Sequence, residues 1–194
     1  QSHIEYDSKK IAYQRDARDV GGPPAIEFKD VWTSGANDPR GLHGVSFSVM
    51  PGQMLGVAGI SGNGQQELGE TLMGMIKNTS GCISLLGQDV KGWPVAKILE
   101  AGVSYITEDP INMAMVPDMR VDENLVLGEL AGYSKGGIWL DIGAIREKIT
   151  ASLSKFPLQL ASHDMRVDKL SGGNIQKVSL AREMELTRQA GSAP

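Results

Sequence analysis

Residues 54–76, with the sequence MLGVAGISGNGQQELGETLMGMI, constrain the fold of this chain more than any other stretch. A short apolar run at residues 55–58 leads into a glycine-rich segment at residues 59–64, and apolar residues then recur at helical spacing at Leu68, Leu72 and Met75. This order predicts a buried strand, a tight loop and an amphipathic helix. Glycines let backbone N–H groups converge, and a helix N-terminus carries about half a positive charge. The loop is therefore a candidate phosphate site.

The loop matches the first six positions of the nucleotide-binding pattern G-x-x-x-x-G-K-[ST], but Gln65 replaces the lysine and Gln66 replaces the hydroxyl residue. A neutral amide cannot neutralise the β- and γ-phosphates, and glutamine is a poorer Mg²⁺ ligand than a short hydroxyl. We therefore expect weak or altered nucleotide binding and poor hydrolysis. A glycine turn in another kind of α/β protein is the alternative on this segment alone. The candidate nucleotide contacts are Gly59, Ser61, Gly62, Asn63, Gly64, Gln65 and Gln66.

Composition narrows the class of protein. With 41% hydrophobic and 22% charged residues, the chain of 194 residues can bury a core and reads as one globular domain. A net charge of −4 does not favour general nucleic-acid binding. We expect no membrane span and no signal peptide, because no apolar run is long enough. Cys82, His3, His43 and His163 show no metal-ligand spacing, so we predict no metal site and a buried, structural role for the thiol.

The segments on either side of the loop give further elements. Residues 1–24 have mixed charges and end in Gly-Gly-Pro-Pro, which predicts a linker or tail. Alternating apolar residues between positions 25 and 49 predict two antiparallel strands. A strand at residues 81–90, a short helix at 94–101 and a strand at 103–106 follow.

The last of these strands ends at Glu108 and Asp109. Residues just past a strand's carboxyl end face the ligand crevice in open α/β sheets, so both are candidate site residues. The alternative is a simple acidic turn before Pro110.

Residues 111–169 are predicted to be helical and separate from the sheet. The methionines at positions 113, 115 and 119 are predicted to line a packing surface, with core filling as the alternative. Within this part, one helix is predicted to bury a stripe of apolar side chains: Ile142, Ile145, Ile149, Leu153 and Phe156.

A second glycine motif, LSGGNIQ at residues 170–176, precedes another helical pattern. Ser171 is a good N-cap, and Gly172 and Gly173 would let a phosphate approach the free N–H groups of that helix. The segment resembles the LSGGQ signature of ATP-binding cassette (ABC) domains, and so does the order of loop, acidic strand end, helical insert and signature. The resemblance covers residues 25–184. The loop variant, the YITEDP turn and the LSGGN start are similar to the degenerate second cassette of ATPase subunits in bacterial importers of simple sugars or nucleosides.

This resemblance implies a P-loop NTPase fold of α/β class and ABC type, with an N-terminal antiparallel β lobe and a helical insert. It assigns residues 25–110 to the β lobe and P-loop part, 111–169 to a helical subdomain, and 170–194 to the signature and its helix. In the family, the signature of one cassette completes the ATP site of another, so Ser171, Gly172 and Gly173 are implied γ-phosphate contacts in trans. Glu108 falls near the position of the family's Q-loop glutamine and is an implied nucleotide contact.

The implied cofactor is ATP, bound weakly or shared with a partner cassette, with Mg²⁺ possible at the partner site. The implied partners are a second cassette, a transmembrane permease and, indirectly, a solute-binding protein, at the inner face of the cell membrane. The aromatic residue that usually stacks on adenine has no clear match, because Phe28 and Trp32 are more readily explained by strand packing.

The family's Walker B strand, which carries a Mg²⁺-binding aspartate and a catalytic glutamate, has no match after Met184. No residue is therefore assigned to catalysis, and the core is expected to be truncated after the signature. We expect a sheet that is incomplete around residues 55–58, or completed by another chain. Two alternatives stay open: a fragment of an active ABC ATPase, and a soluble cassette protein with no permease.

Overall fold

The computed structural model describes residues 21–33, 41–60, 62–128, 133–135, 139–155 and 164–190. The chain divides into two compact units, Gln1–Ile98 and Leu99–Pro194, and each is considered by itself. Most of the predicted linker at residues 1–24 and Ser61 of the candidate loop lie outside the described residues. The predicted domain boundaries at residues 24, 110 and 169 stay predictions.

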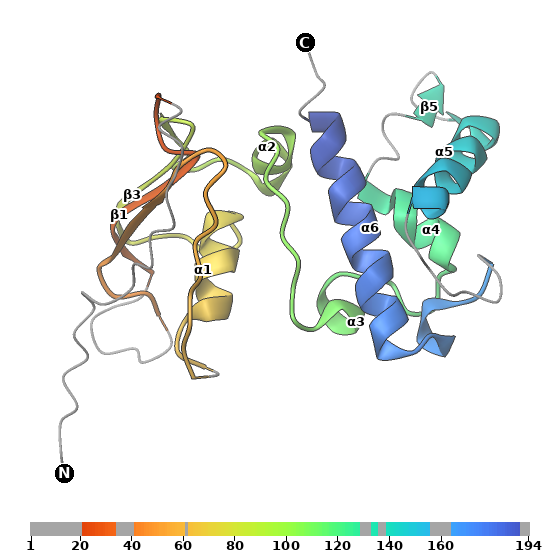
Figure 1. Ribbon diagram of the computed structural model, residues 1–194, viewed down its shortest axis with the longest axis horizontal. Helices are drawn as coiled ribbons and strands as arrows, with labels where there is room; N and C mark the ends of the chain where they lie inside the picture. The colour runs from red at the N-terminus through yellow and green to blue at the C-terminus, as the bar shows by residue number, and fades with distance from the viewer. Residues whose placement is uncertain are drawn as a thin grey trace. The chain divides into compact units, whose positions relative to one another are not determined.

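The first unit is built on a four-stranded antiparallel sheet with the order β2-β1-β3-β4 (Figure 1). Its strands are β1 (Ile26–Trp32), β2 (Val45–Val49), β3 (Ser80–Leu85) and β4 (Gln88–Asp89). The predicted antiparallel pair is confirmed, since Phe28 lies opposite Phe47 of β2 and its ring stacks on that ring with centroids 4.7 Å apart. Phe28 is buried in this packing, as predicted.

Two side chains on this sheet were singled out in the sequence. Trp32 donates from Nε1 to Asp30 Oδ1 at 3.0 Å and meets the His43 ring edge-on, so its surroundings are those of a packed strand residue. Cys82 of β3 is half-buried rather than fully buried. Its burial, together with the nearby carboxylate of Asp89, raises the pKa of the thiol.

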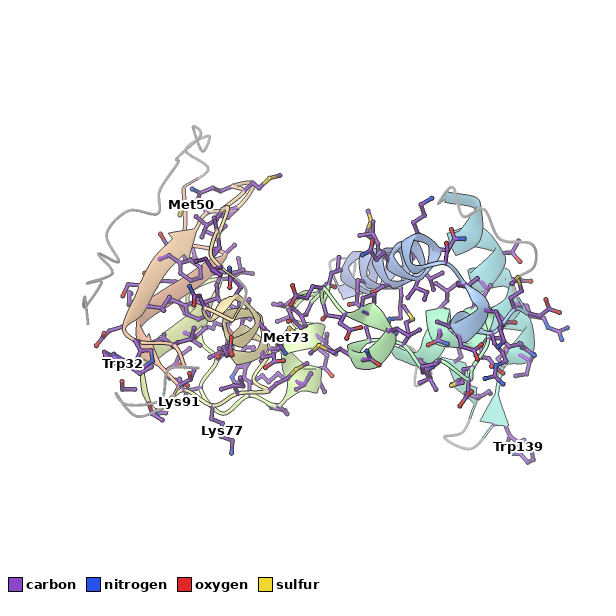
Figure 2. The ribbon with its side chains drawn as sticks, turned by 90° about the horizontal axis from the view of Figure 1, so that it is seen from below. Trp32, Met50, Met73, Lys77, Lys91 and Trp139 are labelled. Carbon is purple, nitrogen blue, oxygen red and sulfur yellow. The ribbon has the colours of Figure 1, made fainter. Side chains whose placement is uncertain are left out.

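Helix α1 (Gln65–Leu72) follows the glycine loop, as predicted, but it ends earlier than the apolar spacing suggested. Gly74 has a φ of 72°, which closes the helix in the left-handed conformation that glycine tolerates. The Met75 N–H accordingly donates back to the Glu70 carbonyl oxygen at 2.9 Å. Met75 is therefore exposed, and Met73 is the residue that is buried instead (Figure 2).

Two predicted strands, at residues 55–58 and 103–106, are not strands in this structure. Val57 is 46% exposed, Ile60 is 70% exposed and Ile106 is 51% exposed. A strand of a parallel sheet is normally paired on its sides and covered on both faces, and no strand of the described ranges pairs with either segment. The described part of the chain therefore has no sheet around residues 55–58, as the first of the two expected alternatives requires, and completion by another chain stays a prediction.

The second unit is mainly helical. Helix α2 (Val95–Glu100) spans the division between the units, and α3 (Pro110–Met113), α4 (Val121–Val126), α5 (Ile142–Lys155) and α6 (Gly172–Ala190) follow. A short hairpin joins β5 (Ser134–Lys135) and β6 (Trp139–Leu140), and the 3₁₀ turn η2 (Val167–Lys169) precedes α6. Helix α6 packs against α3, α4 and α5 (Figure 1). The core beneath α6 includes Val121, Leu125, Ile145, Ile149, Val167, Ile175 and Val178.

The predicted stripe on α5 is confirmed in its middle and wrong at its start. Ile145 and Ile149 are buried, whereas Ile142 is 53% exposed because it opens the helix directly after the exposed hairpin residues Trp139 and Leu140. Figure 2 shows Trp139 projecting away from the helices. The Leu153 side chain and Phe156 lie outside the described residues.

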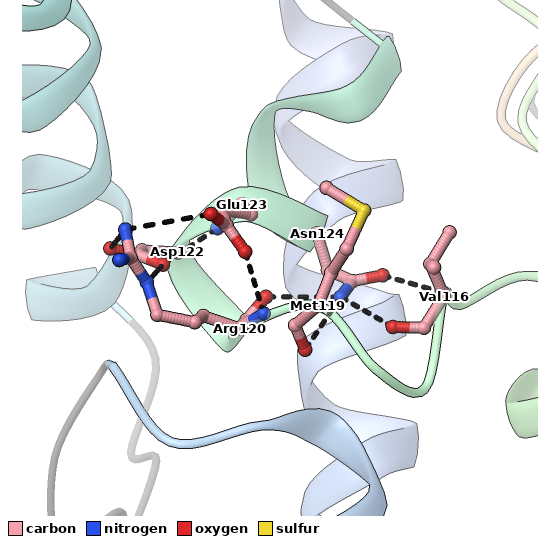
Figure 3. Close-up of polar contacts among 6 residues, drawn as sticks. All are labelled: Val116, Met119, Arg120, Asp122, Glu123 and Asn124. Atoms are coloured by element: carbon pink, nitrogen blue, oxygen red, sulfur yellow. Dashed lines mark hydrogen bonds and ion pairs between the residues drawn. The ribbon is translucent and has the colours of Figure 1, made fainter.

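A buried asparagine fixes the turn that leads into α4 (Figure 3). Asn124 is fully buried, and its Oδ1 accepts a hydrogen bond from the Val116 N–H at 2.8 Å. Its Nδ2 donates to the carbonyl oxygens of Val116 at 3.1 Å and Arg120 at 3.0 Å. Glu123 completes the helix start, since its Oε2 accepts from the Arg120 N–H at 2.8 Å. One side chain thus satisfies several backbone groups of the segment between α3 and α4.

Candidate functional site

The glycine loop forms an open turn in front of α1. The Asn63 N–H donates to the Ile60 carbonyl oxygen at 3.1 Å. Gly62 and Gly64 have φ values of 87° and 97°, a conformation that L side chains rarely adopt, so the turn requires glycine at both positions. Gly62 and Asn63 are exposed, and the loop faces solvent.

The Gln65 side chain folds back over this loop. A Cβ atom placed on Gly59 would lie 2.5 Å from Gln65 Nε2, closer than real Cβ contacts, so the amide lies directly against the loop backbone at that glycine. Here the lysine of the nucleotide-binding pattern would supply a positive charge. The loop thus has a neutral amide at the position where the pattern has a charged group, and its role as a phosphate site stays a prediction.

The Gln66 side chain is held along the outside of α1. Its Nε2 donates to Glu70 Oε1 at 2.7 Å, one helical turn further on. This contact directs the amide along the helix and brings a carboxylate close to it. Among the residues that the structure describes, no group of three His, Cys, Asp or Glu side chains could hold a metal ion.

The two carboxylates of the acidic turn, Glu108 and Asp109, have different surroundings in the structure. Asp109 caps α3, since its Oδ2 accepts from Asn112 Nδ2 at 2.7 Å and its Oδ1 from the Asn112 N–H at 3.4 Å. Pro110 occupies the first turn, where its missing N–H costs nothing. The acidic turn before a proline is therefore a helix start at Asp109. Glu108 remains a solvent-facing carboxylate beside it.

The signature segment lies at the exposed N-terminus of α6. The Ser171 carbonyl oxygen accepts from the N–H groups of Asn174 at 2.9 Å and Ile175 at 3.0 Å, so the helix begins as the sequence predicted. Ser171, Gly172 and Gly173 are exposed, and a Cβ atom on either glycine would meet nothing within 4 Å. The first N–H groups of a helix have no partner within it, and here the surface around them is open.

The segment before the signature is fixed by contacts that the sequence analysis missed. Val167 is fully buried, and its N–H donates to the Met119 carbonyl oxygen at 3.1 Å. Arg166 forms ion pairs with Asp118 and with Asp168, the latter at 2.8 Å. The hydrogen bond from Arg166 holds the pKa of the Asp168 carboxyl below its usual value. The charged residues of MRVDK were the available signal, but two of the partners, Asp118 and Met119, lie far away in the chain.

The candidate residues belong to different units. Gly59, Gly62, Asn63, Gly64, Gln65 and Gln66 lie in the first unit, and the structure brings Gln65 onto Gly59. Glu108, Ser171, Gly172 and Gly173 lie in the second. No helix in the described part of the chain is long and apolar enough to cross a membrane.

Curated relatives of this chain are import proteins. The xylose import ATP-binding protein of Photobacterium profundum is 34% identical over 179 residues, which cover 89% of this chain and 34% of the relative. The guanosine import ATP-binding protein of Bacillus subtilis is 30% identical over 182 residues, covering 91% of this chain and 35% of the relative. The chain thus spans about a third of the length of these relatives.

Solved structures support the same fold. A dimeric ATP-binding cassette in a post-hydrolysis state, bound to ADP and phosphate, matches with a TM-score of 0.68 at 18% identity, covering 82% of this chain and 68% of that one. A bacterial Atm1-family ABC exporter with ATP bound matches with a TM-score of 0.59 at 26% identity, covering 84% of this chain and 28% of that one. The α/β fold of ABC ATPase cassettes, predicted from the two glycine motifs, is thereby confirmed. The family model described as ABC transporter matches residues 42–189, most of the chain, and this protein therefore belongs to the ABC transporter family as an ATP-binding domain.

Proposed function

We propose that this chain is the nucleotide-binding, energy-coupling cassette of an ABC importer for sugars or nucleosides. In this proposal its own glycine loop is catalytically degenerate, and its signature segment serves an ATPase site on a partner cassette. The observation that carries the proposal is the signature at the open N-terminus of α6, where neither Gly172 nor Gly173 has a neighbour that would block an approaching phosphate. The names of the relatives, which import xylose, ribose and guanosine, support the solute class.

The degenerate loop follows from the chemistry of its side chains. Catalysis of phosphoryl transfer depends on positive charge around the transferred group, and Gln65 supplies only a neutral amide. The Gln66 side chain is hydrogen-bonded to Glu70, and an amide is a weak ligand for Mg²⁺. The loop would then hold ATP weakly, and the Mg²⁺ needed for hydrolysis would sit with the nucleotide of the partner cassette.

The remaining partners are proposed from the same relatives. An importer cassette docks on a transmembrane permease and acts, through it, with a solute-binding protein, at the inner face of the cell membrane. Met113, the last residue of α3, and Val116, in the segment that follows it, are exposed apolar residues that would suit contact with an apolar permease surface.

The experiment that tests the proposal is the substitution Ser171→Arg in the reconstituted full-length assembly. A long charged side chain at this helix start would block the approach of a phosphate to the N–H groups, whereas a change at an exposed N-cap costs only about 1 kcal/mol of stability. We expect both transport and ATP hydrolysis to fall while circular dichroism of the variant stays unchanged.

Thr150→Arg, an equivalent change at an exposed position of α5, is the matched control and is expected to leave both activities intact. Undiminished transport in a folded Ser171→Arg assembly would overturn the role of the signature in trans.

A further inference from the structure

Arg182 lies in the middle of α6 with its side chain only 11% exposed. Its Nη1 donates to the carbonyl oxygen of Ala114 at 2.6 Å, and its Nη2 lies 3.0 Å from Glu183 Oε1. Its Nε also donates to Glu183 Oε1, at 3.1 Å. A charged group is expensive to bury unless it is paired and hydrogen-bonded, and an apolar side chain would fill this space without that cost. The guanidinium is therefore held here by its contacts with Ala114 and Glu183.

Those contacts reach the turn that carries Glu108. Ala114 directly follows α3, and α3 begins two residues after Glu108. On the other side of the turn, Ser104 Oγ donates to the carbonyl oxygen of Glu183 at 3.1 Å. The segment from Ser104 to Ala114 is thus fastened at both ends to two successive residues of one helix, Arg182 and Glu183.

The same helix carries the signature at its start. From Gly172 to Arg182 it is continuous, and a rise of about 1.5 Å per residue places the two points about 15 Å apart on one rigid rod. Val178, midway between them, is fully buried in the core of the unit. A displacement of the Glu108 turn would therefore reach the signature through α6, provided that the turn stays fastened to it.

We propose that Arg182 is a positioning residue that fixes the Glu108 turn to the signature helix, so that the two candidate contacts move as one body. Its effect on ATP hydrolysis rests on the proposed function, in which the signature acts on a partner's nucleotide. Its effect on geometry does not depend on that function. Arg182→Gln removes the contact to Ala114 and the charge beside Glu183, whereas Arg182→Lys keeps the charge and one donor of similar reach.

The first measurement is the distance between spin labels at positions 108 and 177, both exposed in the second unit, in the full-length protein with Cys82 and any other native cysteines replaced. We expect a narrow distance distribution with Arg182, a broadened or shifted one in Arg182→Gln, and a near-native one in Arg182→Lys. Arg146→Gln, an equivalent loss of an exposed arginine on α5, is the matched control and is expected to change nothing. A purely stabilising role would lower the unfolding temperature and leave this distance unchanged, and that result would overturn the proposal.

The second measurement is steady-state ATP hydrolysis by the reconstituted, unlabelled assembly. We expect Arg182→Gln to lower kcat about tenfold with a small change in KM for ATP, Arg182→Lys to restore most of it, and Arg146→Gln to have no effect. If Ser171→Arg impairs hydrolysis and folded Arg182→Gln does not, the positioning role is wrong while the proposed function stands. If Ser171→Arg is without effect but the distance changes in Arg182→Gln, the proposed function is wrong while the positioning role stands.

Discussion

The glycine loop and the signature segment are both glycine-rich turns that open a helix, yet they are supported very differently. Behind the loop, residues 55–58 have no strand partner in the described chain, and α1 has only eight residues. The signature, by contrast, opens α6, which has 19 residues. The buried side chain of Val167 anchors the preceding turn to a core, and that of Val178 anchors the helix to the same core. Similar local sequence therefore gives, in one unit, a candidate anion site at the start of a helix that packs on a core. In the other unit it gives a loop whose preceding segment, residues 55–58, forms no strand.

The largest expected difference is in the free energy of unfolding, when the same negative charge is introduced next to the signature and next to the glycine loop. Val178→Asp buries a carboxylate beneath α6 and is expected to lower the free energy of unfolding by more than about 4 kcal/mol. Val57→Asp, at an exposed residue behind the glycine loop, is expected to change it by less than about 0.5 kcal/mol. Urea unfolding followed by circular dichroism measures both, and equal losses would contradict the comparison.

Removing the buried amide of Asn124, in the second unit, should have the next largest effect on the free energy of unfolding. Asn124→Ala leaves the N–H of Val116 and several carbonyl oxygens without their partner, so the free energy of unfolding should fall by about 2–3 kcal/mol. Gln53→Ala is the matched change in the first unit, where Oε1 of Gln53 accepts from the Met50 N–H at 2.8 Å in a less buried place. It should cost about 1 kcal/mol or less. The ranking fails if Gln53→Ala proves the more damaging.

The double substitution Gln65→Lys with Gln66→Ser tests whether side-chain chemistry is what weakens the loop. Restoring a positive charge and a metal-binding hydroxyl should tighten ATP binding about tenfold, measured with a fluorescent ATP analogue and Mg²⁺. Turnover by this chain should stay at background with either sequence, because no residue is assigned to water activation.

Gln88→Lys, which adds the same charge on exposed β4, is the control for a general electrostatic effect. An affinity unchanged by the double substitution would mean that the loop does not hold phosphate. Mg²⁺-dependent turnover that Gly64→Asp abolishes would show that the loop is catalytic after all.

The smallest effect concerns the ion pair in front of the signature. The hydrogen bond from Arg166 lowers the pKa of Asp168 in the folded state, so the pair stabilises the fold above the unfolded pKa of about 4. That contribution is lost as the pH falls below this value through the folded pKa. In Arg166→Gln, the pKa of Asp168 measured by NMR titration should rise towards its ordinary value. An identical titration in both proteins would show that the pair is absent in solution.

Local pattern was sufficient for much of the fold. The alternation around Phe28 and Phe47 predicted a strand pair that the register confirms, because one apolar face per strand is enough to specify such a pair. Ser171 before two glycines and an apolar helical pattern predicted where α6 begins, because a helix start depends on a few neighbouring residues. The two glycine motifs in this order also identified the family that the match over residues 42–189 shows.

Tertiary structure decided what depended on distant partners. An apolar run such as residues 55–58 becomes a buried strand only where other strands pair with it, and sequence periodicity does not say whether they do. No sequence pattern singled out Arg182 or Asn124, yet Arg182 donates to the Ala114 carbonyl oxygen and Asn124 accepts from the Val116 N–H. Backbone propensity acts between neighbours in the chain, and it therefore fixed the turns and helix starts. Burial and hydrogen bonding act between neighbours in space, and they decided which of those turns stands on a core.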